Sequence, residues 1–137
     1  MMKKLDQRGV AAMEFCIVAL PLFTLMFAIF DLGRYALMAQ SVRALASAGA
    51  RAMMVACYTP AVAQNTSPSG CTGNYMSTAQ MQAVTPFLYA GGLSPTLSIT
   101  SGASALTVTA SEPGFTMLMP IWGTTLNAPS ASTQIPF

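Results

Sequence analysis

A run of mostly apolar residues from Val10 to Phe30 limits what this chain can fold into. As a helix the run is about 31 Å long, at a rise of about 1.5 Å per residue, and this length matches the hydrocarbon core of a bilayer. The whole chain is 53% hydrophobic and only 7% charged, which is far from the composition of an ordinary soluble domain. The sequence therefore predicts one membrane-spanning helix at residues 10–30.

The charges on either side of the run predict its orientation. Lys3, Lys4 and Arg8 precede it, whereas Asp31 and Arg34 follow it. Because basic residues favour the cytoplasmic side of a membrane, we expect the N-terminus to lie in the cytoplasm. The chain after the run then lies across the membrane.

One carboxylate, that of Glu14, lies inside the apolar run. A charged side chain in a membrane-spanning helix costs roughly 2.5 to 3.5 kcal/mol on insertion scales, so Glu14 is expected to be functional and to have a partner. If the chain were cut between Gly9 and Val10, the freed α-amine of Val10 would carry a positive charge, and Glu14 would be the fifth residue of the mature protein. Two interpretations stay open: Glu14 pairs with such an amine, or it lies near the interface of a plain anchor and reaches water.

The helical pattern continues after the membrane run. Small and apolar residues recur at alternating spacings of three and four, which indicates one buried stripe. The residues of this stripe are Tyr35, Met38, Val42, Leu45, Gly49, Ala52 and Ala56. We therefore expect a single helix over residues 11–56, about 70 Å long at about 1.5 Å per residue, with a local kink or loosening at Pro21.

A ridge of small side chains recurs at every fourth position of this helix: Ala44, Ala48, Ala52 and Ala56. Such a ridge lets another backbone approach closely. Two partners stay open for it, the chain's own distal domain and another subunit.

Two of the cysteines are expected to form a disulfide. Cys57 closes the expected helix, and Cys71 lies in a stretch rich in Pro, Ser, Thr, Gly and Asn, residues 59–75, which indicates an exposed loop. In an oxidising periplasm the bond would close a loop of about 15 residues and add roughly 3 kcal/mol. Cys16 is expected to stay unpaired. The chain has no His, so we expect no metal site and no bound cofactor.

The distal part of the chain predicts a small α+β unit. Ser77 and Gln80 have the form of a capping box, so a short helix is expected to begin there and to end before Gly91. Apolar and polar residues then alternate on both sides of residues 101–104, which predicts a β-hairpin. Its apolar residues are Leu97, Ile99, Leu106, Val108 and Ala110. A third strand, interrupted at Pro120, is expected over residues 115–122, and the tail 124–137 is expected to be loosely ordered.

The distribution of charge argues against catalysis and against nucleic-acid binding. After Arg51 the only charged residue is Glu112. The distal part of the chain has almost no ionisable side chain that could act as a general base or activate a nucleophile. We therefore expect no enzyme activity and no catalytic residue. Nucleic acid is not an expected partner, because its phosphates need clustered Lys or Arg.

Several blocks of the sequence resemble a known family. The start of the chain resembles type IV pilin-like precursors at Lys3, Lys4, Arg8, Gly9 and Glu14. Residues 9–15, 30–34 and 44–51 together resemble the TadE-like pseudopilins of the tight-adherence secretion system. Members of that family typically show a Gly before the cut, a fifth-position Glu followed by an aromatic, an acidic-x-Gly-Arg step after the membrane run and an Ala-rich segment that ends in Gly-Ala-Arg.

The resemblance implies a minor pseudopilin that contributes to a pilus for surface attachment. A prepilin-type peptidase would cut after Gly9, and Glu14 would neutralise the Val10 amine of a neighbouring subunit during assembly. The implied partners are other pilin or pseudopilin subunits, the peptidase, the inner-membrane assembly platform and the lipid bilayer. The implied location is the bacterial inner membrane, with incorporation into an extracellular pilus left open. The implied organisation is a leader at 1–9, a transmembrane helix at 10–30, its extramembrane continuation at 31–56 and a distal domain at 57–137.

Other functions stay open at this point. A single-pass anchor that presents a small periplasmic binding module would keep Met1 to Gly9, and Glu14 would be incidental. A pseudopilin of a different machine, such as a type II secretion system, would usually carry a longer β-rich domain. Major pilins of the tight-adherence system are generally much shorter than this chain, which favours a minor component. The choice between an E-type and an F-type pseudopilin also stays open.

Overall fold

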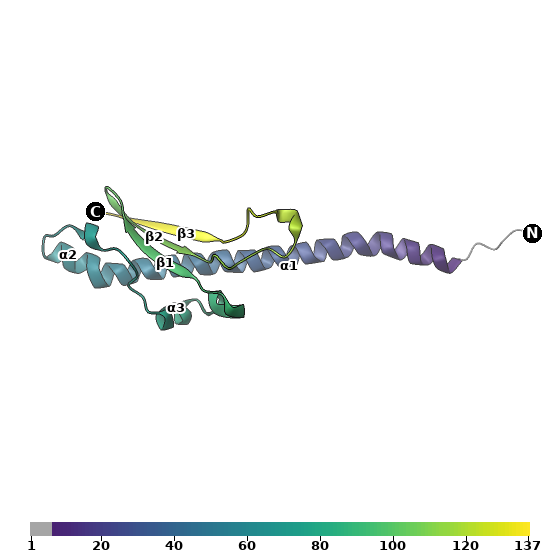
Figure 1. The fold of residues 1–137 in the computed structure, drawn as a ribbon, viewed down its shortest axis with the longest axis horizontal. Coiled ribbons are helices and arrows are strands. Elements are labelled where there is room, and N and C mark those ends of the chain that lie inside the picture. The colour runs from purple at the N-terminus through teal and green to yellow at the C-terminus, as the bar shows by residue number, and fades with distance from the viewer. Residues whose placement is uncertain (1–6) are drawn as a thin grey trace, which may run out of the picture.

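One long helix and a small antiparallel sheet make up the protein, which confirms the predicted α+β fold class. The computed structural model describes residues 7–137, so Lys3 and Lys4 of the expected leader lie outside the described residues. Helix α1 (Gln7–Met53) forms the long axis, and the other elements gather along its C-terminal half (Figure 1). In chain order these are η1 (Met54–Tyr58), α2 (Thr59–Ala63), η2 (Pro68–Gly70), α3 (Thr78–Val84), η3 (Pro86–Gly92), β1 (Thr96–Ser101), β2 (Ala105–Ser111), η4 (Pro120–Trp122) and β3 (Ser130–Pro136).

The helix runs further than predicted at its C-terminal end. A π-helical turn, η1, joins α1 to α2, so that helical backbone continues to Ala63 instead of ending at Ala56. Pro60 lies in the first turn of α2, directly after the π-helical turn in which the Thr59 amide donates to the Met54 carbonyl. The loop predicted over residues 59–75 was wrong at residues 59–63, which are helical although they include Pro60. Pro21 lies inside α1 and does not end it.

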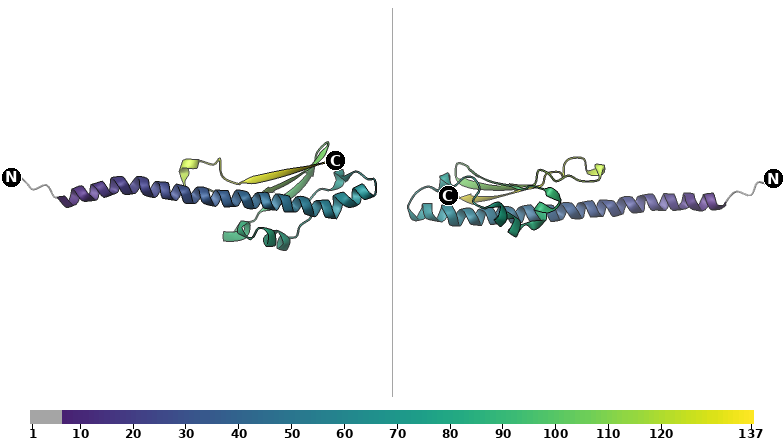
Figure 2. Two further views of the ribbon diagram at one scale, coloured as in Figure 1. Left: turned by 180° about the vertical axis from the view of Figure 1, so that it is seen from behind. Right: turned by 60° about the horizontal axis from the view of Figure 1, so that its bottom comes forward.

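The sheet consists of three antiparallel strands in the order β1-β2-β3, with β2 at its centre. β1 and β2 form the predicted hairpin, in which Leu97 lies opposite Ala110. β3 pairs with the other edge of β2 and places Ile135 opposite Leu106. The sheet lies along one side of α1, while α3 lies on another side of the same helix (Figure 2).

The third strand was predicted in the wrong segment. Residues 130–136 form β3, although they were expected to be a loose tail, and residues 115–122 form a connection that contains only the short turn η4. In β3 only Ala131 and Ile135 pack against the core, so the apolar pattern of this strand is weak. The strand exists because β2 offers a second edge whose backbone groups need partners.

The short helix α3 begins as predicted at a capping box. The hydroxyl of Ser77 accepts a hydrogen bond from the Gln80 amide at 3.3 Å, and the Gln80 side chain accepts one from the Ser77 amide at 2.8 Å. The helix ends at Val84, and the hydroxyl of the buried Thr85 donates to the carbonyl of Met81 at 2.9 Å. The chain then turns into η3, which carries Leu88 into the core.

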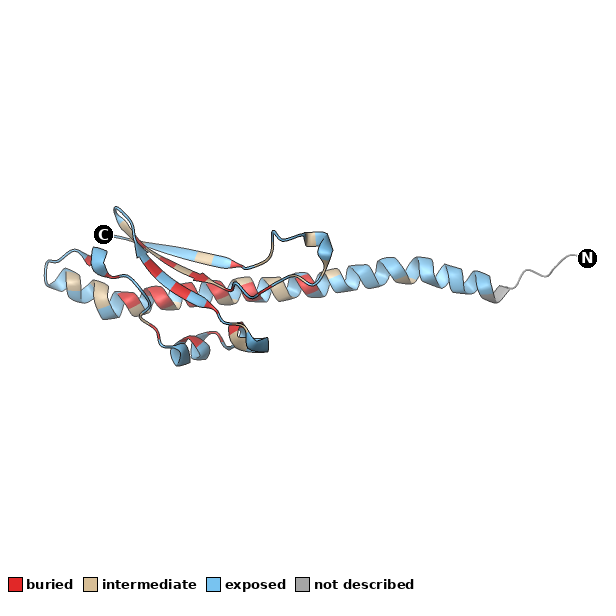
Figure 3. Ribbon diagram, in the orientation of Figure 1, coloured by how far each residue is buried: buried red, intermediate tan, exposed pale blue. Residues whose placement is uncertain are grey.

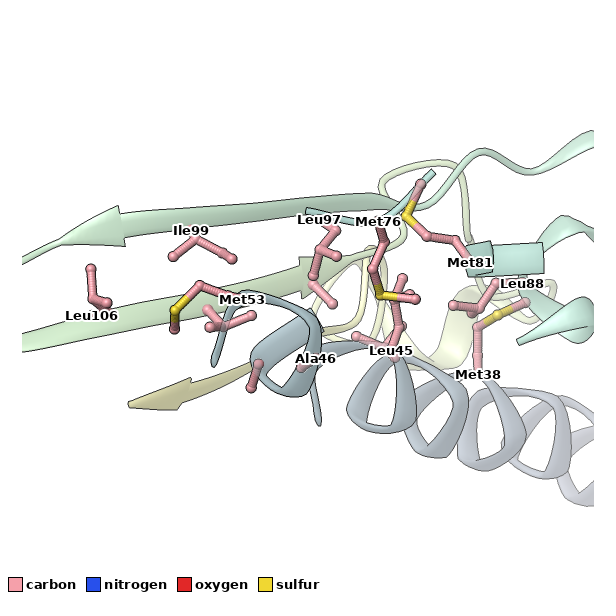
Figure 4. Packing of buried hydrophobic residues seen from close by; sticks show 14 of the residues in the cluster. Met38, Leu45, Ala46, Met53, Met76, Met81, Leu88, Leu97, Ile99 and Leu106 are labelled. Carbon is pink, nitrogen blue, oxygen red and sulfur yellow. The ribbon is translucent and has the colours of Figure 1, made fainter. Parts of the chain in front are cut away.

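Among the residues whose burial the structure describes, those that are buried lie in the C-terminal half of α1 and in the elements packed on it (Figure 3). Residues from α1, the segment before α3, η3 and the sheet meet in one apolar cluster (Figure 4). The predicted stripe is buried at Met38, Val42, Leu45 and Gly49. Further on, the buried face is centred on Met53, so that Ala52 is half-buried and Ala56 is exposed.

The ridge of small residues faces the chain's own α3 over part of its length. Ala44, Ala48 and Ala52 line an open groove of about 540 Å³, and Ala83 and Val84 of α3 form its other wall. Ala44 and Ala56 remain exposed. This geometry agrees with packing on the distal domain and leaves part of the ridge accessible.

Gly49 allows the sheet to approach α1 closely. A Cβ atom at this position would lie 2.8 Å from both terminal methyl carbons of Leu97 in β1. Gly33 lies on the same helix, and a Cβ there would meet nothing within 4 Å. A larger side chain at Gly49 would therefore clash with Leu97, whereas no neighbouring atom restricts the side chain at Gly33.

We predict that Gly49→Leu lowers the free energy of unfolding by roughly 1 to 3 kcal/mol, because the larger side chain overpacks the interface with Leu97. Gly33→Leu is the matched control and should be neutral or stabilising by roughly 0.5 to 1 kcal/mol, since leucine favours a helix more than glycine does and a Cβ at this position meets no other atom within 4 Å. Chemical denaturation of the full chain in detergent, followed by near-ultraviolet circular dichroism, measures both. Equal stability of the two variants would contradict the close approach.

Candidate functional site

No other part of the described chain covers the N-terminal half of α1, residues 9–30, which we call the bare half. Within the described part of the chain, residues 9–30 are exposed except for the half-buried Ala19 and Ala28. Exposed apolar side chains include Phe15, Ile17, Leu20, Leu25, Ile29 and Phe30, each at 60% or more of full exposure. This helix is long and apolar enough to cross a membrane. An apolar surface of this kind needs lipid or other helices around it.

The structure places the expected processing and assembly residues on this bare half. Gly9 and Val10 are both exposed, and they belong to the first turns of α1. Glu14 is exposed as well and lies about one helical turn beyond Val10, on the same face of the helix. A Cβ at Gly9 would meet nothing within 4 Å, so the protein's own fold does not explain the glycine there.

Asp31, at the boundary between the bare and the covered halves of α1, is a site that sequence reasoning missed. Its side chain is only 2% exposed. Its carboxylate accepts the backbone N–H of Leu118 at 3.0 and 3.1 Å and that of Met119 at 3.0 Å. The Arg34 guanidinium lies one helical turn on, with Nη1 3.4 Å from the carboxylate oxygen. Bonds from amide donors to a charged acceptor are roughly twice as strong as neutral ones, so Asp31 holds the 118–119 backbone against α1.

Arg34 and Tyr35 extend this contact to Phe115. The guanidinium carbon of Arg34 lies 5.3 Å from the centroid of the Phe115 ring, and the Tyr35 ring centroid lies 6.4 Å from it. Phe115 is 1% exposed and belongs to the core. The connection from β2 to β3 is therefore attached to α1 at two neighbouring points. The acidic residue with an Arg three positions later was the available signal, but nothing in the sequence indicated which distant segment it would bind.

A second carboxylate, that of Glu112, is fully buried at the start of the same connection. Its Oε1 accepts the backbone N–H of Gly114 at 3.1 Å, whereas Oε2 has no hydrogen-bond partner among the described residues. Burial, together with the negative charge of Glu112, raises the pKa of the Tyr89 phenol above its usual value, so this group stays protonated at neutral pH.

Cys57 and Cys71 form the expected disulfide, with their Cα atoms 5.7 Å apart. The bond ties the π-helical turn after α1 to the loop that leads toward α3, and it buries Cys71 in the core. Cys16 is free and exposed on the bare half of α1. Nowhere in residues 7–137 do three His, Cys, Asp or Glu side chains gather as they would around a metal ion.

Residues 9–51 match the family model of the TadE-like protein. The matched segment contains Gly9, Val10, Glu14, Asp31 and Arg34, and it ends within the covered half of α1. No curated protein and no solved structure matches the chain. The family match confirms the resemblance that the sequence blocks predicted, and the distal domain lies outside it.

We predict that Asp31→Ala speeds hydrogen exchange at the Leu118 and Met119 amides by about tenfold or more, because losing a hydrogen bond to a charged acceptor costs roughly 1.5 to 3 kcal/mol. Asp31→Asn keeps one acceptor oxygen and should have an intermediate effect. Exchange measured by mass spectrometry on peptides that span residues 115–122 tests this order. The Leu106 amide in β2 serves as the internal control and should not change, since its strand is paired on both edges. Unchanged exchange at residues 118 and 119 in Asp31→Ala would refute the assignment.

Proposed function

Because residues 9–51 of this chain are TadE-like, we propose that the protein is a minor pseudopilin of a tight-adherence pilus, cut by a prepilin-type peptidase after Gly9. The observation that carries the proposal is the bare apolar half of α1, which bears Glu14 close to the expected cut. A helix with such a surface is suited to a bilayer first and to a bundle of like helices afterwards. Its distal domain then lies outside the membrane or on the outside of the filament.

Glu14 is the residue that fixes how subunits align. Cleavage between Gly9 and Val10 frees an α-amine at the start of the helix, where the helix dipole adds further positive potential. The carboxylate of Glu14 is costly in a bilayer, and the amine of a neighbouring subunit removes this cost by pairing with it. Since each subunit carries one such amine and one such carboxylate, the pairing sets the stagger between adjacent helices.

The expected orientation places the distal domain in the periplasm. The basic residues before the apolar run favour a cytoplasmic N-terminus. The Cys57–Cys71 disulfide supports an oxidising compartment for the distal domain. The membrane partners in this proposal are the peptidase, the assembly platform of the pilus and other subunits.

The role in this proposal is structural and not catalytic. After Arg51 the sequence has a single charged residue, Glu112, and this carboxylate is buried and accepts a backbone amide. A fully buried carboxylate that already accepts a backbone amide is poorly placed to act as a general base on a substrate from solvent.

A second candidate function is a single-pass anchor that presents a binding module. The open groove of about 540 Å³ between α1 and α3 favours it, since its walls are mostly apolar with Arg51 and Gln80 among them. In that case the leader stays attached and Glu14 is incidental. Processing at Gly9 separates the two functions.

We predict that Gly9→Trp leaves the full-length precursor in the inner membrane, because a large side chain next to the cut blocks the peptidase. Gly33→Trp adds the same side chain to the same helix at a site with free space, so it should be processed normally. Intact mass and N-terminal sequencing of protein from host membranes distinguish a chain that begins at Val10 from one that keeps the leader. Normal processing of Gly9→Trp would refute cleavage by the peptidase after Gly9.

We predict that Glu14→Ala is still cleaved but enters pili far less efficiently, because the lost carboxylate is the partner of the neighbouring amine. Glu14→Asp keeps the charge and should retain part of the incorporation. Immunoblotting of sheared pili against the membrane fraction measures the ratio. Wild-type incorporation of Glu14→Ala would leave Glu14 as an incidental residue of a plain anchor.

A further inference from the structure

The connection between β2 and β3 reaches back along α1 toward its bare half. Figures 1 and 2 show η4, at residues 120–122, as the part of the distal domain that lies nearest the N-terminal half of the helix. The Leu118 and Met119 amides bind Asp31, the first residue after the apolar run that ends at Phe30. This turn therefore lies at the level where α1 leaves the expected bilayer.

The side chains of the turn are apolar, and those of Leu118 and Ile121 are exposed. Leu118 is 74% exposed and Ile121 is 59% exposed, and the chain's single tryptophan, Trp122, is half-buried beside them. No charged residue occurs between Glu112 and the last residue, Phe137. The indole Nε1 of Trp122 is buried and has no hydrogen-bond partner among the described residues, so Leu118 and Ile121 provide the exposed apolar surface of the turn.

We propose that the turn at residues 118–122 inserts into the periplasmic leaflet of the same bilayer that α1 spans. Leu118 and Ile121 contact the acyl chains, and the half-buried Trp122 lies next to Ile121 at the same boundary. The contact is apolar and does not depend on lipid charge, since the turn carries no basic side chain and the nearby Arg34 already pairs with Asp31. This inference rests on the membrane-spanning role of α1 in the proposed function.

Most backbone amides of the turn have partners within the protein, as amides near lipid require. Those of Leu118 and Met119 go to Asp31, that of Trp122 lies 3.5 Å from the Met119 carbonyl, and that of Gly123 goes to the Pro120 carbonyl at 3.1 Å. Pro120 has no N–H, and the Ile121 amide has no partner among the described residues. Gly123 has φ of 57° and ψ of −138°, a conformation almost restricted to glycine, which lets the chain reverse after the turn.

The consequence of this insertion is a fixed placement of the distal domain on the membrane. A single helix leaves the domain free to tilt relative to the membrane. A second contact at the turn, held to the helix by Asp31, restricts this tilt. The groove between α1 and α3 then stays at a defined height above the membrane surface.

The single tryptophan provides a direct test. The full chain, reconstituted into phosphatidylcholine vesicles, should show a blue-shifted Trp122 emission that falls when the lipids carry bromine close to the headgroup end of the acyl chains. Bromine at the methyl end should quench less, because the turn reaches only the outer part of the leaflet. Adding phosphatidylglycerol should change neither result, and quenching that requires the anionic lipid would overturn the apolar contact.

A double variant and its matched control separate insertion from general effects. Leu118→Ser with Ile121→Ser should reduce the lipid quenching of Trp122. Val55→Ser with Val62→Ser removes two exposed apolar side chains, 78% and 50% exposed, at the far end of the helical axis, and should leave the quenching unchanged. Equal quenching in both double variants would overturn the assignment of Leu118 and Ile121 as the inserted residues.

The free thiol of Cys16 distinguishes failure of this inference from failure of the proposed function. If α1 spans the bilayer, a membrane-impermeant maleimide leaves Cys16 unmodified under non-reducing conditions. Modified Cys16 would refute the spanning helix, and the inserted turn with it. Protected Cys16 with a water-exposed, unquenched Trp122 would refute the inserted turn alone. A blue shift that lipid bromine does not quench, and that grows with the protein-to-lipid ratio, would assign the turn to a contact with a second copy instead.

Discussion

The distal domain depends on the packing of one face of α1 against the inner face of the sheet. A small sheet needs an apolar face or a helix to pack against, and here the sheet packs on α1. Leu45 and Met53 of α1 supply one side of the core, and Leu106 and Val108 of β2 supply the other, all of them fully buried. The helix that completes the core also continues as the bare apolar segment. The domain and its anchor are therefore joined by one continuous rod, and their relative positions follow from the helix itself.

Asp31 marks the point on this rod where the environment changes. In sequence it ends the apolar run, and in space it draws the 118–119 backbone onto the helix. A buried carboxylate is tolerated because two amides and Arg34 compensate its lost hydration. The same charge thus separates the bare half of α1 from the covered half and brings an apolar turn to the boundary. Both proposed contacts with the membrane, the spanning helix and the turn, meet at this residue.

Local patterns predicted the parts of the structure that local physics controls. The spacing of Met38, Val42 and Leu45 indicated the buried face of the helix, and Ser77 with Gln80 indicated the start of α3. The hairpin and the disulfide followed in the same way from alternation and from compartment chemistry. The processing and assembly roles of Gly9 and Glu14 come from residue patterns and resemblance, and the fold only places these residues on an exposed helix face.

The sequence by itself determined a long helix with a membrane-grade half, an α+β distal unit and a TadE-like N-terminal segment. Each of these features follows from periodicity, composition or a short motif, and such patterns involve residues that are close together in the sequence. Only the tertiary structure decided the third strand, the role of Asp31 and the position of the apolar turn. Those features join residues far apart in the chain, such as Asp31 and Leu118, which are separated by 87 positions. Every residue except proline has a backbone N–H, so the sequence does not indicate which N–H will donate to Asp31. Only the folded structure shows that the Leu118 and Met119 amides lie next to its carboxylate.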